Sequence, residues 1–166
     1  MRLLASVLLL CTASAVRAQV PDIVGTWKFN AAASKLPAGA PPQSDVRRYS
    51  LMPDGTLVGL AVIVDAHGVP TFLQFAARPD GKDYPEFDSG TAAQYLKDGS
   101  PPPRTYSEKP VDARTVEWVD KRNGTIVGRG RKWVSADGKT LSFTSEGSGA
   151  DGRRVEYLFV FDRTGS

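Results

Sequence analysis

Cysteine and histidine are almost absent from this chain. Its 166 residues include one cysteine, Cys11, and one histidine, His67. This shortage excludes a disulfide framework, most metal sites built from Cys and His, and most catalytic sets that pair a serine or cysteine nucleophile with a histidine base. The sequence therefore predicts a protein that is not an enzyme and that uses neither a metal nor a cofactor.

Long runs of charge are also missing. The chain is 41% hydrophobic and 23% charged, which is typical of a globular protein and not of a disordered one. The formal net charge is only +3, and no basic run is long enough to bind nucleic acid. A length of 166 residues suits one domain. Nucleic-acid binding is therefore not expected.

The N-terminal 18 residues have the pattern of a secretory signal. Arg2 precedes a mostly apolar stretch from Leu3 to Val16, and Ala18 supplies a small residue at the expected cleavage site. The apolar stretch is too short for a membrane span. We therefore expect a cleaved signal at 1–18, export to the periplasm or the medium, and a mature domain at 19–166 that has no cysteine and no membrane span.

Glycine turns divide the rest of the chain into apolar segments of about ten residues. Asp-Gly and Asn-Gly pairs supply the positive φ angles that tight hairpins require. The turns are Pro53-Asp54-Gly55, Ala66-His67-Gly68, Pro79-Asp80-Gly81, Arg122-Asn123-Gly124, Ala136-Asp137-Gly138 and Ala150-Asp151-Gly152. This spacing predicts an all-β, antiparallel, up-and-down sheet.

Eight or nine strands are expected. Their approximate ranges are 23–30, 45–52, 57–64, 70–77, 103–108, 114–121, 125–134, 139–145 and 153–161. An open meander of this length would leave two exposed edges, so closure into a barrel is the economical arrangement. Gly128 and Gly130 would allow the sharp coiling that closure requires.

One segment breaks the strand pattern with a helix signal. Thr91 is a candidate N-cap, Ala92 to Asp98 would form a short helix, and Gly99 would end it before three prolines. Its position between strands predicts a helix at the rim of the barrel. The sequence leaves open whether it covers the barrel mouth or is a plain surface insertion.

The first strand carries a family resemblance. Gly25-Thr26-Trp27 resembles the G-x-W signature of lipocalins, in which the tryptophan plugs the closed end of an eight-stranded barrel. The wider pattern is similar to small exported bacterial lipocalin-like (calycin-type) proteins of unassigned function. The matching segments are GTWKFN with Ser34-Lys35, DGKDYP at 80–85, RTVEW at 114–118 and SADGKTL at 135–141.

The resemblance implies a fold more than an activity. Gly25 and Trp27 would be its structural signature, and an arginine would pack on the tryptophan, either Arg153 or Arg154. The cysteine pair usual in lipocalins is absent. The ligands of lipocalins are therefore not carried over to this chain.

Candidate ligand contacts are the aromatic residues expected to face the lumen: Phe75, Tyr106, Trp118 and Tyr157. Arg129 and Arg131 share one strand face. If that face points inward, the two guanidinium groups would need a carboxylate or phosphate partner, such as a fatty-acid head group. If it points outward, both are solvated, and Ile126, Gly128, Gly130 and Val134 face the core; this alternative is favoured.

Asp83, Glu86 and Asp88 gather in what the sequence indicates is a loop. Such carboxylates can do acid–base chemistry or bind Ca²⁺, but their spacing matches no known ligand loop, so a solvated turn is favoured. His67 lies in a hairpin turn without a partner in the sequence and is expected to be inert.

Two functions remain compatible with the sequence. The first is a barrel that binds a small hydrophobic or amphipathic molecule. The second is a barrel filled by its own side chains, which acts as a structural or protein-interaction module of the cell envelope, as many small barrels are filled in this way. The sequence determines neither the identity of a ligand nor the oligomeric state.

Overall fold

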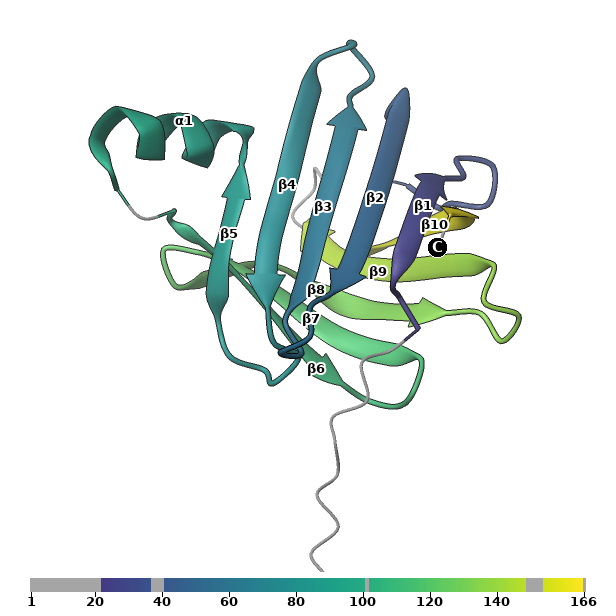
Figure 1. The fold of residues 1–166 in the computed structure, drawn as a ribbon. Coiled ribbons are helices and arrows are strands. Elements are labelled where there is room, and N and C mark those ends of the chain that lie inside the picture. The colour runs from purple at the N-terminus through teal and green to yellow at the C-terminus, as the bar shows by residue number, and fades with distance from the viewer. Residues whose placement is uncertain (1–21, 37–40, 101, 149–153, 166) are drawn as a thin grey trace, which may run out of the picture.

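The computed structural model describes residues 22–36, 41–100, 102–148 and 154–165, and these form a closed antiparallel barrel with one helix (Figure 1). Each strand pairs with the next along the chain, including β5 and β6, which are separated in sequence by the short helix α1. β1 closes the ring by pairing with β10. The elements are β1 (Gly25–Phe29), β2 (Ser44–Leu51), β3 (Leu57–Val64), β4 (Pro70–Ala77), β5 (Tyr84–Asp88), α1 (Ser89–Asp98), β6 (Arg104–Pro110), β7 (Thr115–Arg122), β8 (Thr125–Val134), β9 (Thr140–Ser148) and β10 (Arg154–Gly165).

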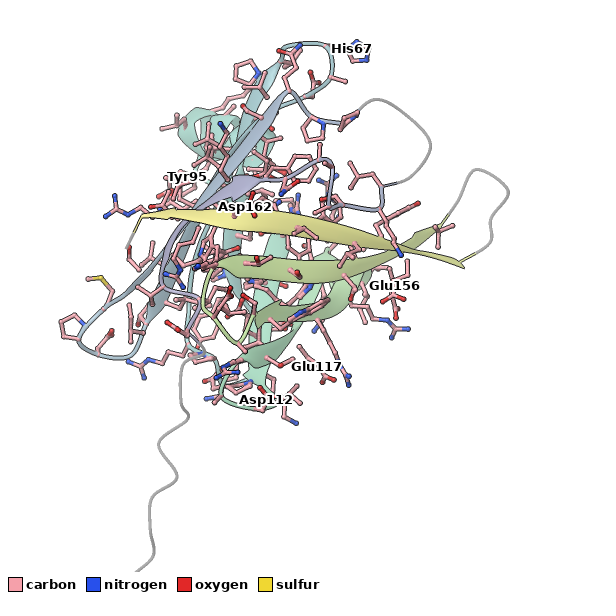
Figure 2. All side chains as sticks on the ribbon, turned by 90° about the vertical axis from the view of Figure 1, so that its right-hand side faces the viewer. His67, Tyr95, Asp112, Glu117, Glu156 and Asp162 are labelled. Carbon is pink, nitrogen blue, oxygen red and sulfur yellow. The ribbon has the colours of Figure 1, made fainter. Side chains whose placement is uncertain are left out.

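The predicted glycine turns connect the strands. Gly55, Gly68, Gly81 and Gly138 all have positive φ angles of 70–84°, and Asn123-Gly124 has positive φ at both positions, as a two-residue hairpin requires. The turn expected at 150–152 lies outside the described residues. His67 occupies the tip of the β3–β4 hairpin and points away from the barrel, while Asp112 marks a turn at the other end (Figure 2).

The barrel has ten strands instead of the expected eight or nine. The additional strand is β5, which includes Glu86 and Asp88, residues expected to lie in a solvated loop. Three residues of β5 pair with β4 and three with β6. The prediction is wrong here because β5 is short and carries two acidic residues, whereas strand signals depend on apolar alternation.

The helix begins three residues before its predicted start. Asp88 is its N-cap and accepts a hydrogen bond from the Thr91 backbone, while the Thr91 hydroxyl accepts one from the Asp88 backbone. Thr91 is therefore the third helical residue and not the cap. Gly99 ends the helix in the left-handed conformation, as predicted. None of the helical structure described is long and apolar enough to cross a membrane.

One end of the barrel is sealed around Trp27, whose indole N–H donates to the Ile23 carbonyl at 2.8 Å. The arginine that stacks on this tryptophan is Arg163, with its guanidinium 4.2 Å from the ring. This corrects the expectation of Arg153 or Arg154. The reason is register: Arg163 lies directly opposite Trp27 on the paired strands β1 and β10.

Gly25 belongs to the same seal. Its φ angle is +140°, and a Cβ there would lie 2.5 Å from Nη1 of Arg163. The guanidinium of Arg163 also donates to the carbonyls of Asp22, Val24 and Gly138. A glycine at position 25 therefore lets one arginine cover the tryptophan and tie the first and last strands together.

The hydrogen-bonded ladder between β8 and β9 is the irregular part of the barrel wall. Their pairing covers only Lys132–Val134 against Leu141–Phe143. Beyond that point Gly130 passes so close to Thr144 that a Cβ would lie 2.0 Å from its carbonyl oxygen. The Trp118 indole donates to the same oxygen at 3.2 Å, beyond the point where the β8–β9 ladder stops.

Candidate functional site in the barrel lumen

The barrel encloses a cavity of about 190 Å³. Six aromatic side chains line it, and five charged side chains reach it from β2, β5, β6, β7 and β8. Phe75 and Tyr106 stack with ring centroids 4.1 Å apart, and Phe143 stacks on Phe159 at 4.6 Å. Rigid aromatic walls of this kind suit a flat or apolar ligand body.

Three of the predicted ligand contacts line this cavity: Phe75, Tyr106 and Trp118. Tyr157 does not. β10 contributes Phe159 to the lining, whereas Tyr157 is half-buried opposite Ser145, which does line the cavity.

Arg129 and Arg131 face outward, which is the alternative that the sequence favoured, so neither lines the lumen as a ligand contact. Arg129 pairs with Glu146 at 2.7 Å and Arg131 with Glu117 at 3.0 Å, and both arginine side chains are more than half exposed. The outward orientation is favourable because surface carboxylates on β9 and β7 neutralise both groups without burying charge.

Lys132, on the opposite face of β8, is the cation that enters the barrel. It is 5% exposed, donates to the Tyr106 hydroxyl at 2.8 Å and pairs with Glu108. Tyr106 in turn donates to the same carboxylate. Burial alone would lower the pKa of Lys132, but the adjacent Glu108 carboxylate raises it above its usual value, so that the ammonium group stays charged.

Arg47 forms a second neutralised pair inside the barrel. Its guanidinium donates from both Nε and Nη2 to the buried Asp45 carboxylate. It lies 4.6 Å from the Phe143 ring centroid and 4.9 Å from that of Phe161. The Asp45 carboxylate therefore neutralises the Arg47 guanidinium, and the two aromatic rings pack against it.

A third group of charged side chains contains more carboxylates than cations. Arg104 lies 2.9 Å from Glu86 and 3.2 Å from Asp88, and it also pairs with Asp120. Arg122, which is half exposed, reaches Asp88 at 3.8 Å. We refer to Glu86, Asp88, Arg104 and Asp120 as the acidic cluster.

Polar atoms of the acidic cluster are left without hydrogen bonds to the residues that the structure describes. They are Oε2 of Glu86, Oδ1 of Asp120 and Nε of Arg104, all of them buried. Glu86 Oε2 does lie near Nη2 of Arg104, but as an ion-pair contact only. A buried polar atom without a hydrogen bond lowers the stability of the folded state, and such atoms are often found in functional sites.

The pKa of Glu86 is raised to about 7. Burial is the main cause, the neighbouring Asp120 carboxyl acts in the same direction, and Arg104 opposes the shift. Burial also raises the pKa of Asp120. Two neighbouring carboxylates repel each other when both are ionised, so one member of this pair keeps its proton to a higher pH than a free carboxyl group does. This pair therefore holds a proton near neutral pH.

A signal for the missed charges was present in the sequence. Side chains two residues apart on a strand share a face, and three strands carry polar or charged groups at that spacing. The inward sets are Asp45, Arg47 and Tyr49 on β2, Arg104, Tyr106 and Glu108 on β6, and Gly130, Lys132 and Val134 on β8. Once Arg129 and Arg131 face outward, parity places Lys132 inside.

Similarity to known proteins is confined to structure. No family model and no curated protein matches the chain. The crystal structure of a mutant of the fluorescent protein UnaG aligns with a TM-score of 0.54 and 15% identity, over 86% of this chain and 96% of that one. Wild-type UnaG aligns with a TM-score of 0.51 and 16% identity, over 86% and 98%. What this chain shares with UnaG is therefore the fold, an antiparallel β-barrel.

The lumen combines aromatic side chains with polar groups that lack hydrogen bonds to described residues. Among the described residues, no group of three or more His, Cys, Asp or Glu side chains is arranged to hold a metal ion. Aromatic side chains in a concave lumen, together with one cluster of incompletely hydrogen-bonded polar groups, are features of a small-molecule pocket.

Proposed function

We propose that this protein binds a small amphipathic molecule in the lumen of its barrel. The observation that carries the proposal is the aromatic cavity that has the orphaned polar atoms of the acidic cluster in its wall. An apolar body would contact Phe75, Trp118 and Phe143, and a polar group would satisfy the cluster.

The size of the cavity limits the ligand. An engineered apolar cavity of about 150 Å³ in another protein accepts benzene. A space of about 190 Å³ therefore holds roughly one ring with a short substituent. The expected fatty-acid head group is not favoured, because the arginines assigned to it face outward and this space is small for a long chain.

One observation favours the filled-barrel alternative. The Lys132–Glu108–Tyr106 network and the Arg47–Asp45 pair occupy much of the lumen with the protein's own side chains. In that case the barrel would act through its outer surface. The two functions differ in whether any small molecule enters the remaining space.

Native mass spectrometry of the protein purified from its own cells tests the proposal, together with NMR titration using 2-phenylethanol. We expect either a bound mass that denaturation removes or saturable shifts of the Trp118 indole signal. Ala61→Phe, which fills the cavity from β3, should abolish both, whereas Val62→Phe on the exposed face of β3 should not. Wild-type protein that shows neither signal would leave the filled barrel as the better account.

We further propose that the protein is exported. The support is the pattern of residues 1–18, which lie outside the described structure. N-terminal sequencing of the protein from the native cell tests this: a mature chain that begins near Gln19 supports export, and one that retains residues 1–18 in the cytoplasm contradicts it.

A further inference from the structure

The charges inside the barrel do not balance. Arg47 and Lys132 are each matched by one carboxylate, Asp45 and Glu108 respectively. The remaining cation, Arg104, is shared by Glu86, Asp88 and Asp120. Even with the partly exposed Arg122 counted beside Asp88, the acidic cluster has one carboxylate more than it has cations.

The surplus carboxylate faces the cavity. Glu86 and Asp120 both line it, and Glu86 is only 5% exposed to solvent. Each has a buried oxygen without a hydrogen bond to any described residue. A carboxylate oxygen is only an acceptor when ionised, so the missing partner must be a hydrogen-bond donor.

The aromatic walls suit a cationic donor. The rings of Phe75, Tyr106 and Trp118 line the same cavity as the two carboxyl groups. Elsewhere in this lumen the protein already places cations against rings, with Lys132 Nζ 4.8 Å from the Tyr49 centroid and Arg47 over Phe143 and Phe161. Aromatic faces attract cations electrostatically, and more strongly where water is excluded.

We infer that the ligand is a small aromatic amine whose protonated nitrogen binds between the carboxyl groups of Glu86 and Asp120. The inference rests on the proposed small-molecule function and specifies its ligand class. One ring with a short aminoalkyl chain matches the cavity volume of about 190 Å³. Binding then releases one proton from the carboxyl pair whenever that pair is protonated.

Several titratable or charged groups surround Glu86. Asp88 lies on its own strand, Arg104 and Tyr106 on β6, and Asp120 and Arg122 on β7. Its direct partner on β4 is Phe75, which does not titrate. Arg104 stays charged at all relevant pH values and Tyr106 stays neutral, because burial raises the pKa of its hydroxyl. The carboxyl pair is therefore the group that changes charge near pH 7.

Three probes of nearly equal shape test the inference: phenethylamine, 2-phenylethanol and phenylacetate. Their dissociation constants are measured by NMR titration of the full mature chain. We expect the amine to bind at least about tenfold more tightly than the alcohol, since charged hydrogen bonds are stronger than neutral ones. The anion should bind most weakly, because the acidic cluster repels it.

The pH dependence supplies a second readout. Because the amine competes with the proton held by this carboxyl pair, its affinity should rise about tenfold between pH 6 and pH 8, while that of the alcohol stays constant. Glu86→Gln should reduce the ratio of amine affinity to alcohol affinity about tenfold. Glu117→Gln, on the outer face beside Arg131, is the matched control and should leave the ratio unchanged.

The outcomes separate the two proposals. An amine that binds no better than the alcohol, or phenylacetate that binds best, would overturn the amine inference and leave small-molecule binding intact. If none of the three probes binds and native mass spectrometry shows no bound mass, the proposed function fails and the inference fails with it; a bound mass that is not an amine overturns the inference alone. If Glu86→Gln does not fold, the pH profile of the wild-type protein decides between the amine and the neutral ligand.

Discussion

A buried charge is stable only when neighbouring groups replace the water that it loses. Asp45, Glu86, Glu108 and Lys132 are all buried in this barrel. Three of them have close ionic partners and full hydrogen-bond networks, whereas Glu86 shares its cation and keeps one oxygen without a hydrogen bond among the described groups. Individual residues therefore distinguish the structural part of the lumen from the part that is available to a ligand.

Removal of Lys132 tests the structural part. Lys132→Met leaves the Glu108 carboxylate buried without its cation, and we expect this to lower the free energy of unfolding by about 3–5 kcal/mol. The double variant Lys132→Met/Glu108→Gln should recover most of the loss, because Tyr106 still has an acceptor and no charge is isolated. Urea denaturation measures both.

Lys82→Met, at an exposed side chain, is the control and should change the stability by less than about 0.5 kcal/mol. Losses that simply add in the double variant would show that Lys132 and Glu108 are not energetically coupled.

At the scale of elements, β5 and α1 form the least regular part of the barrel. β5 has five residues and three paired positions on either side, and α1 follows it without a loop. Figure 1 shows α1 projecting at the end of β5, and Tyr95 packs edge-on against Phe87 with centroids 6.1 Å apart. Asp88 belongs both to the acidic cluster and to the helix cap, so it connects α1 to the cavity wall.

Loss of the helix cap should therefore loosen α1 without unfolding the barrel. Asp88→Ala removes the acceptor for the Thr91 backbone N–H, which costs about 1–2 kcal/mol of local stability. Hydrogen exchange of the amides in α1 should become roughly tenfold faster, while those of β2 and β3 stay protected.

Asp88→Asn keeps a capping side chain and should behave much more like the wild type. Asp112→Ala removes a comparable turn carboxylate far from α1 and serves as the control. Equal exchange rates for α1 in Asp88→Ala and the wild type would contradict the assignment of Asp88 as its cap.

At the scale of the whole molecule, closure of the barrel allows charged side chains to be buried, and the described part of the chain achieves this without a disulfide. Every described strand is paired on both sides, although the ladder between β8 and β9 is short, so the described sheet has no open edge. Closure also excludes water from the lumen, and this desolvation is the first cause of the raised pKa of Glu86.

The stability of the protein should therefore fall as the pH rises toward neutrality. The folded pKa of Glu86, about 7, is above its ordinary value of 4.5, so between these values the folded state holds a proton that the unfolded chain releases. This contribution is complete below pH 4.5 and is lost as the pH rises to 7. It amounts to at most about 3 kcal/mol, since one pKa unit corresponds to about 1.4 kcal/mol.

Urea unfolding at pH 4.5, 6 and 8 measures this dependence, and Glu86→Gln should flatten it. Asp112→Asn is a suitable control, because backbone hydrogen bonding lowers the pKa of Asp112 and its effect falls at more acidic pH. A wild-type protein that becomes more stable between pH 4.5 and 7, with no change of slope in Glu86→Gln, would contradict a buried proton at this carboxyl pair.

Much of the fold follows from local chemistry in the sequence. Positive-φ glycines determine the turns, alternation of apolar residues determines most of the strands, and Gly25 with Trp27 identifies the sealed end. Phe75, Tyr106 and Trp118 are predictable as cavity residues because large aromatic side chains on strands pack into a shared interior. These properties depend on neighbours along the chain.

Tertiary structure alone decided which charged side chains of the site lie next to one another. Glu86, Arg104 and Asp120 lie on three different strands, and only the closed register brings them together. The same holds for Arg163 on Trp27 and for the pairing of Lys132 with Glu108. The physical reason is that hydrogen-bonded register sets which distant side chains meet, and the energy of a buried charge depends on those partners and not on its neighbours in sequence.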